Sequence, residues 1–207
     1  MRTIMAGLIL ATLIGSGSLL GAPATVTYIL DPSQSKFMAH ANAGGLLWFK
    51  GKDHHLAARE FSGQVEITPD TITPASLRLV VKAGSLHETG AKFTDQEKEI
   101  INKELREIVL HPDQYPDITF QSTGVTVKNS NAGRHEVRID GNLTLHGTTK
   151  RITIPAVVTL SGNTLRAIGE FSIERDDFGV KATSAFHGLV RVQNDVKFDF
   201  DIVGRRS

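Results

Sequence analysis

The chain has 207 residues, of which 40% are hydrophobic, with 23 Lys and Arg against 22 Asp and Glu and no cysteine. This charge balance gives no electrostatic footprint for a polyanion, so we expect neither nucleic acid nor an anionic membrane surface as a partner. The lack of cysteine excludes a disulfide framework, a thiol nucleophile and an acylated N-terminal cysteine, so the core alone must stabilise the fold.

Residues 1–24 have the order of a secretory signal peptide. Arg2 precedes an apolar run from about Ile4 to Ile14, and a Gly/Ser-rich stretch then ends in Ala22-Pro23-Ala24. This order predicts cleavage near Ala24, a periplasmic or secreted protein, and one mature domain over residues 25–207. The alternative is an uncleaved membrane anchor, for which the apolar run is short.

The mature chain has the period-two pattern of strands. Strands are predicted at about 25–30, 35–41, 61–67, 76–82, 117–122, 137–145, 151–160, 165–173 and 196–203. In the last of these, Phe198 and Phe200 alternate with charged residues, as in a strand with one apolar face and one face in water. Many such strands favour an antiparallel barrel, with a solid two-sheet sandwich as the alternative. Gly141 and Gly169 fall on the inward phase and predict a bend or a close approach.

Asp53, His54 and His55 combine residue types that bind metals or move protons. Adjacent side chains of a strand point to opposite faces, so His54 and His55 cannot easily share one metal ion. A zinc site needs three or four converging ligands, and the other histidines are scattered, with His40 and His146 on outward strand positions. We interpret Asp53, His54 and His55 as solvated turn residues. Two alternatives are headgroup contacts at a barrel mouth and a metal site of a metal-dependent enzyme.

Residues 94–109 interrupt the strand pattern and predict one amphipathic helix between strands. Thr94 and Glu97 have the spacing of a capping box. Ile101, Leu105 and Ile108 recur at helical spacing and form an apolar stripe. We expect this stripe to plug one end of the barrel, and the alternative is a lid over a ligand entrance.

The inward positions of a hollow barrel would line its cavity. The candidates for this ligand-binding lining are Phe37, Phe120, Leu143, Leu145, Ile152, Ile154, Phe171, Ile173, Phe198 and Phe200. The sequence has no GxSxG elbow, no Gly-rich phosphate loop after a strand and no dinucleotide fingerprint. We therefore assign no catalytic residue and no metal site, and expect the protein not to be an enzyme.

Four segments in a fixed order resemble the YceI-like family. They are "FSGQVEI" (61–67), "HPDQYPDITFQSTGV" (111–125), "DGNLTLHGTTKRITI" (140–154) and "IERDDFGV" (173–180). The resemblance spans essentially the whole mature chain. The stretch 85–110 is richer in Glu and Lys than is usual in the family, so no headgroup contacts are transferred from relatives.

The resemblance implies an all-β fold, an extended antiparallel eight-stranded lipocalin-like barrel with an elongated apolar cavity. Family members are secreted bacterial proteins, mostly periplasmic, that bind polyisoprenoids or other long amphiphiles. We predict a non-catalytic protein that sequesters or carries a polyisoprenoid or a similar lipid, with that lipid as its ligand and no cofactor. A solid-core interaction module remains an alternative, and the sequence leaves open a membrane-protein partner and a homodimer.

Overall fold

The computed structural model of the chain describes residues 25–69, 71–181, 183–185, 187 and 189–207. The predicted signal peptide and its cleavage site lie outside these residues. The strands are β1 (Val26–Leu30), β2 (Lys36–Gly44), β3 (His54–Ala58), β4 (Phe61–Thr68), β5 (Ile72–Lys82), β6 (Leu86–Glu88), β7 (Asp117–Asn131), β8 (Arg134–Leu145), β9 (Thr148–Ser161), β10 (Thr164–Glu174), β11 (Ser184–Ala185) and β12 (Val190–Arg206). The helical segments are α1 (Asp95–Glu104), the π-helical turn η4 (Leu105–Leu110) and the 3-10 turns η1 (Pro32–Gln34), η2 (Trp48–Lys50), η3 (Ala83–Ser85) and η5 (Arg175–Phe178).

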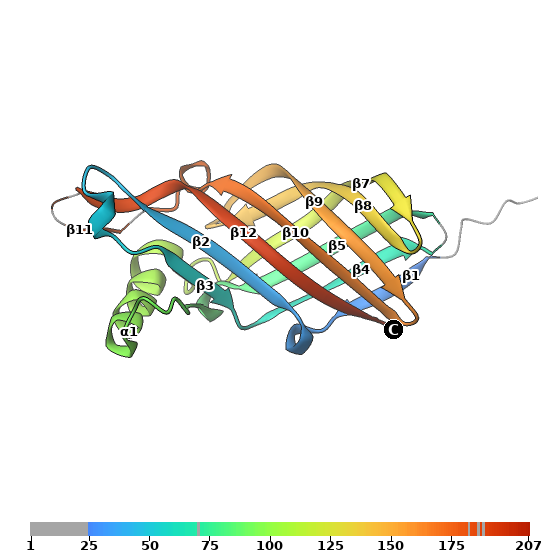
Figure 1. Cartoon of the computed structure of the whole chain (residues 1–207), viewed down its shortest axis with the longest axis horizontal. Coiled ribbons are helices and arrows are strands. Elements are labelled where there is room, and N and C mark those ends of the chain that lie inside the picture. The colour runs from blue at the N-terminus through green and yellow to red at the C-terminus, as the bar shows by residue number, and fades with distance from the viewer. Residues whose placement is uncertain (1–24, 70, 182, 186, 188) are drawn as a thin grey trace, which may run out of the picture.

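Eight antiparallel strands close into a barrel, as the sequence predicts (Figure 1). Around the ring, each strand pairs with the next in the order β1, β4, β5, β7, β8, β9, β10 and β12. The ring closes between its ends, where Leu30 of β1 lies opposite Gly204 of β12. Closure leaves no free edge in this ring, which distinguishes the fold from the alternative two-sheet sandwich.

The barrel is extended because three pairs of strands follow one another with only a short bend between them. β1 continues into β2 through η1, β3 into β4 through Arg59 and Glu60, and β5 into β6 through η3. Beyond the bends, β2 pairs with β12 and β3, and β3 pairs with β6. The wall therefore runs on past the closed ring to the end that carries α1 (Figure 1).

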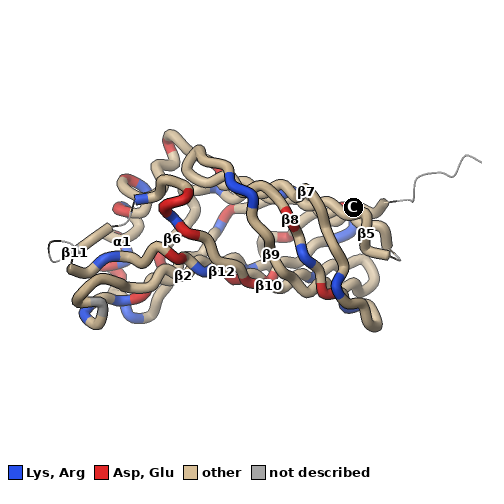
Figure 2. Tube along the Cα trace, turned by 90° about the horizontal axis from the view of Figure 1, so that it is seen from above, with Lys and Arg blue, Asp and Glu red and all other residues tan. Residues whose placement is uncertain are grey.

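The side chains of the long strands alternate between the interior and a charged outer face. Figure 2 shows that Lys, Arg, Asp and Glu of both signs are distributed along the barrel. Arg166 of β10 and Asp201 of β12 form a two-bond ion pair with distances of 2.7 and 2.5 Å. Phe200 and Ile202, the neighbours of Asp201 in sequence, are buried. The period-two pattern thus correctly separates the inside from the outside.

Helix α1 contacts β6. Among the described residues, β6 is the last strand in the order of the sheet. Thr94 caps the helix, since its Oγ1 accepts the amide hydrogen of Glu97 and Glu97 Oε2 accepts that of Thr94. The predicted capping box is confirmed. In the described part of the chain, no helix is both long enough and apolar enough to cross a bilayer.

The helix ends in the π-helical turn η4, which changes the residues that face the barrel. The amide of His111 donates to the carbonyl of Arg106, five residues earlier, at 3.0 Å. A π-helical turn has more residues per turn than an α-helix, so the inward-facing position shifts by one residue. Val109 therefore lines the interior, and Ile108 is 43% exposed. The predicted apolar stripe is therefore wrong at Ile108.

Two inward glycines allow aromatic rings to lie against the barrel wall. A Cβ on Gly169 would lie 2.4 Å from the carbonyl oxygen of Pro155 and 2.5 Å from the Phe200 ring. A Cβ on Gly141 would lie 2.4 Å from the Phe120 ring. The predicted close approaches are confirmed, and each glycine leaves room for a ring that also lines the interior.

We expect Gly169→Ala to lower the free energy of unfolding by about 1–3 kcal/mol, because its Cβ would overlap the backbone oxygen of Pro155. Gly124→Ala in β7 is the matched control, because no atom lies within 4 Å of its new Cβ. Urea denaturation of both variants measures the difference. Equal losses in the two variants would contradict the close approach at Gly169.

Candidate functional site

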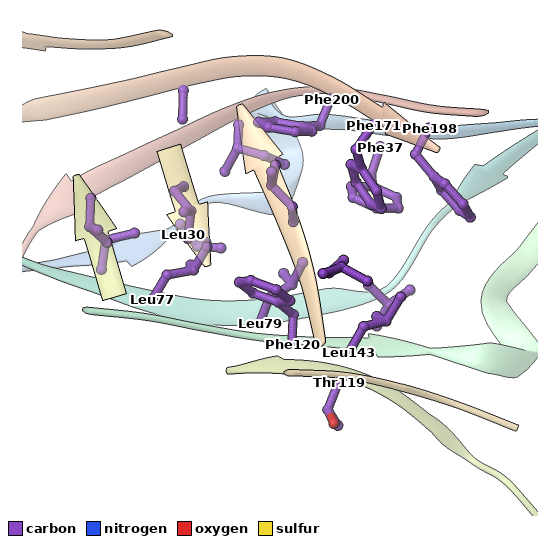
Figure 3. A pocket seen from close by; sticks show the side chains of 18 of the residues that line it. Leu30, Phe37, Leu77, Leu79, Thr119, Phe120, Leu143, Phe171, Phe198 and Phe200 are labelled. Atoms are coloured by element: carbon purple, nitrogen blue, oxygen red, sulfur yellow. The ribbon is translucent and has the colours of Figure 1, made fainter. Parts of the chain in front are cut away.

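The barrel encloses a cavity of about 140 Å³ whose 28 lining residues include only two polar ones, Ser76 and Thr119. Three aromatic rings from different strands gather at one part of it (Figure 3). The rings of Phe171 and Phe198 stack with centroids 5.0 Å apart, and those of Phe37 and Phe198 lie 6.0 Å apart. An apolar cavity of this size offers water almost no hydrogen bond and accepts hydrocarbon.

All ten residues that the sequence analysis proposes as lining face this cavity. They come from β2, β7, β8, β9, β10 and β12. The structure adds residues from β4 and β5, among them Val65, Leu77, Leu79 and Val81, which the sequence analysis did not name. Alternation within the predicted strands at 61–67 and 76–82 is the signal that identifies them. Contact of any of these residues with a ligand remains a prediction.

A second cavity of about 140 Å³ continues from the first towards helix α1. The two share the lining residues Leu86, Ile118, Leu145, Ile173 and Phe198. The residues that α1 and η4 contribute to the second cavity are Ile101, Glu104, Leu105, Val109 and Leu110. Because the two spaces adjoin, the apolar interior runs from the closed ring to the space beneath the helix.

The second cavity also has polar lining residues, which are His54, Glu104, Arg175, Lys181 and Thr183. Arg175 is held in place, since its guanidinium donates to Asp176 Oδ1 at 2.6 Å and to the Val180 carbonyl at 2.8 Å. Lys181 is exposed at the rim. The combined space is therefore apolar along most of its length and polar near one end.

The structure places Asp53, His54 and His55 in three different environments. Asp53 precedes β3, and its Oδ1 accepts the amide hydrogen of Ala43 at 3.1 Å. His54 and His55 lie in β3 and are half-buried, so their interpretation as solvated turn residues is wrong. Of the three, His54 alone lines a cavity. A five-residue strand between two loops gives too short a pattern for the sequence to distinguish it from a turn.

His54 is oriented by a buried carboxylate that the sequence analysis did not identify. Its Nδ1–H donates to Oε2 of Glu88 at 2.8 Å, and the Glu88 side chain is fully buried. Glu88 Oε1 accepts the amide hydrogens of Gly90 at 2.7 Å and of His55 at 3.1 Å. Since Nδ1 carries the proton, the Nε2 atom of His54 is the one available to a ligand.

The environment of Glu88 keeps it charged inside the protein. Burial alone would raise the pKa of its carboxyl, but the hydrogen bonds from His54, Gly90 and His55 outweigh burial and lower that pKa below 4.5. The amide of Glu88 also donates to Asn102 Oδ1 at 2.7 Å, which ties β6 to α1. Glu88 therefore connects the helix to the histidine that faces the cavity.

His55 points to the outer face, away from His54. Its Nδ1 lies 2.8 Å from Nδ1 of His40, and Nε2 of His40 bonds to Asp199. His40 bridges the other two side chains, so the three do not converge on one point. Among the described residues, no group of three or more His, Cys, Asp or Glu side chains could hold a metal ion.

His146 lies in the turn between β8 and β9 and not on an outward strand position, which corrects the sequence analysis. Its φ of 51° is left-handed, and its ring lies 4.4 Å from that of Tyr115. Burial lowers the pKa of His146, and its Nε2 is buried without a hydrogen-bond partner. The predicted strands at 137–145 and 151–160 leave His146 between them, but the direction of its ring depends on tertiary packing.

We expect Glu88→Gln to lower the free energy of unfolding at pH 7 by about 1–2 kcal/mol, since it weakens the bond to His54. The lowered pKa of Glu88 stabilises the fold above pH 4.5, and this contribution is lost as pH falls through the folded-state pKa. The difference between wild type and variant should therefore shrink in acid. Denaturant unfolding measured over pH tests this, with the exposed Glu99→Gln as control. A difference in stability between wild type and Glu88→Gln that does not change with pH would contradict a lowered pKa of Glu88.

Comparison with known protein sequences gives one family. Residues 28–204 match the YceI-like domain. The chain is also 30% identical over 150 residues to the UPF0312 protein VPA0850 of Vibrio parahaemolyticus. This alignment covers 70% of this chain and 68% of that protein.

Solved structures share the fold at lower sequence identity. Burkholderia cenocepacia BcnA has a TM-score of 0.65 and 21% identity, covering 84% of this chain and 98% of its own. A polyisoprenoid binding domain from Saccharophagus degradans has a TM-score of 0.63 and 17% identity, and the match covers 88% of this chain and 99% of that domain. The Campylobacter jejuni YceI protein has a TM-score of 0.59 and 16% identity, covering 73% and 84%.

Proposed function

Since the chain belongs to the YceI-like family, we propose that it binds a polyisoprenoid or a similar long-chain amphiphile inside the barrel, without catalysis. In this proposal, the protein is exported to the periplasm. There it sequesters or carries this lipid with no further cofactor. The Saccharophagus degradans domain, which is described as polyisoprenoid binding, supports the ligand class.

The observation that carries the proposal is the shape and chemistry of the joined cavities. Apart from Ser76 and Thr119, apolar side chains surround the space within the ring, and the charged lining residues belong to the second cavity. A long apolar tail with one polar end matches this distribution. A solid-core interaction module, the alternative from the sequence, would have no such space.

Tail burial supplies the binding energy in this proposal. Each methylene moved from water into an apolar site contributes about 0.8 kcal/mol before ordering costs. Because every part of the tail contributes similarly, the cavity within the ring selects for length and thickness. Recognition of one lipid over another then depends on the polar end.

The polar end of the ligand would meet His54, Arg175 and Lys181. The Nδ1–H of His54 is occupied by Glu88, so its Nε2 can accept a hydrogen bond from a ligand hydroxyl or donate one when protonated. The two cationic side chains that line the second cavity suit oxygen-rich groups that accept hydrogen bonds, and Glu104 is the one anionic side chain beside them in that lining. Of the predicted headgroup contacts, the proposal keeps His54 and omits Asp53 and His55, which do not line the cavities.

We expect Phe171→Glu to abolish lipid uptake, because a carboxylate facing the cavity would have no partner and would oppose burial of the tail. Native mass spectrometry of protein purified gently from the periplasm measures bound lipid. Ile168→Glu is the control, since Ile168 lies on the same strand and is 47% exposed on the barrel surface. Wild-type lipid content in a folded Phe171→Glu protein would refute the assignment of the cavity.

The helix over the second cavity provides a further test of ligand entry. If α1 and η4 form a lid, residues 95–110 should exchange amide hydrogens more slowly when lipid fills the space that Leu105 and Val109 line. Hydrogen exchange of lipid-loaded and delipidated protein measures this change. Equal protection of the segment in both states would exclude a lid and leave the helix as a fixed plug.

A further inference from the structure

Three large apolar side chains are exposed together at the end of the barrel that carries α1. Leu46 is 77% exposed, Phe49 63% and Leu189 42%. They come from two segments that are hydrogen-bonded to each other, since the amide of Leu47 donates to the Leu189 carbonyl at 2.9 Å. We name this surface the barrel tip, defined by Leu46, Phe49, Leu189 and the flanking Lys50 and Arg191.

Large exposed apolar side chains concentrate at this end of the molecule. Among the described residues they are Ile29, Leu46, Phe49, Ile100, Ile108, Ile168 and Leu189. Ile100 and Ile108 belong to α1 and η4, which lie at the same end as the barrel tip (Figure 1). Only Ile29 and Ile168 lie elsewhere, each on a strand of the closed ring. Scattered apolar residues need no explanation, whereas a concentration at one end points to an interaction.

The charged residues of the two segments that form the barrel tip are cationic. Lys50 and Arg191 are exposed and flank the apolar side chains. Neither segment 41–50 nor segment 183–192 contains an Asp or a Glu, although acids are frequent along the rest of the barrel (Figure 2). Long basic side chains beside apolar ones are suited to the boundary between lipid tails and phosphate groups.

The barrel tip adjoins the polar end of the second cavity. Thr183, which precedes β11, and Val192 of β12 line that cavity. Beside Val192, Arg191 of the tip pairs with Gly44 of β2. The surface therefore lies next to the place where a ligand would enter or leave.

We propose that the barrel tip docks on the surface of a phospholipid bilayer by inserting Leu46, Phe49 and Leu189 among the lipids. Docking brings the polar end of the cavity to the membrane. A long-chain lipid is then not exposed to water during transfer. The contact is mainly apolar, which is consistent with the balanced charge of the whole chain.

The size of the barrel tip favours a bilayer over a second copy of the chain or another protein. A stable protein interface uses about 20–30 residues and about 800 Å² on each side. The barrel tip offers three large apolar side chains at a projecting end. Shallow insertion into a fluid surface needs no complementary partner and only a few such side chains.

The test measures co-sedimentation of the protein with phosphatidylcholine vesicles and its insertion into a phosphatidylcholine monolayer. Protein is purified after export, and mass spectrometry verifies its N-terminus, because the apolar residues 1–24 would themselves enter lipid. The protein should co-sediment with the vesicles and raise the surface pressure of the monolayer. High salt should change the affinity little, because insertion is apolar.

The double variant Leu46→Ser/Leu189→Ser should bind vesicles at least about tenfold more weakly than wild type. Ile29→Ser/Ile168→Ser is the matched control, since it removes exposed apolar side chains away from the tip and should bind as wild type does. Both variants should take up detergent-solubilised lipid normally, which separates this proposal from that of the cavity.

Equal vesicle affinity of the two double variants, or a wild-type protein that leaves the surface pressure of the monolayer unchanged, would overturn the proposal. A wild-type protein that does not bind vesicles but self-associates through the barrel tip would also overturn the proposal. That result would identify the tip as a protein–protein contact.

Discussion

The pairing of β1 with β12 is the constraint on which the remaining structure depends. It joins the first and last strands of the described chain, so the sheet becomes a ring with Leu30 opposite Gly204. Without this pairing, both strands would expose unpaired backbone groups, and the apolar face of the sheet would be open to water. Because the ring is closed, that face can remain incompletely filled, and an interior space becomes compatible with a stable fold.

The long strands could be predicted because the alternation of apolar and polar residues that defines each strand lies within its own sequence. Alternation through Phe198, Phe200 and Ile202 identifies both β12 and its inward face, and the same pattern identified ten of the residues that line the first cavity. The polar end could not be predicted in this way. Glu88 is a lone acid in a three-residue strand, and its importance comes from His54 in a distant segment. Ile108 shows the same limit, because a π-helical turn changes the phase that an α-helical pattern assumes.

The two parts of the interior differ in the kind of selectivity that they can provide. Hydrocarbon contacts in the closed ring are numerous and non-directional, so exchange of one aliphatic lining residue for another alters shape more than chemistry. His54 and Arg175 are fixed in direction by their own hydrogen bonds, so small changes there alter which polar group fits. The stretch 85–110, which departs from the usual family pattern, supplies Glu88 and the helix over this end. Substitutions in this stretch can therefore alter the polar end of the interior while the barrel stays the same.

The glycines beneath Phe120 and Phe200 determine the bore of the barrel. A ring that lies flat on the wall occupies the depth that a side chain at Gly141 or Gly169 would otherwise fill. Each ring therefore lies closer to the wall than it could above a larger residue. A larger residue at either position would push the ring towards the axis and narrow the lumen. The same Cβ would also lie 2.4 Å from the Pro155 oxygen at Gly169 and 2.6 Å from the Gln121 oxygen at Gly141, both on a neighbouring strand. The width of the lumen and the pairing of the wall are therefore coupled at these two levels.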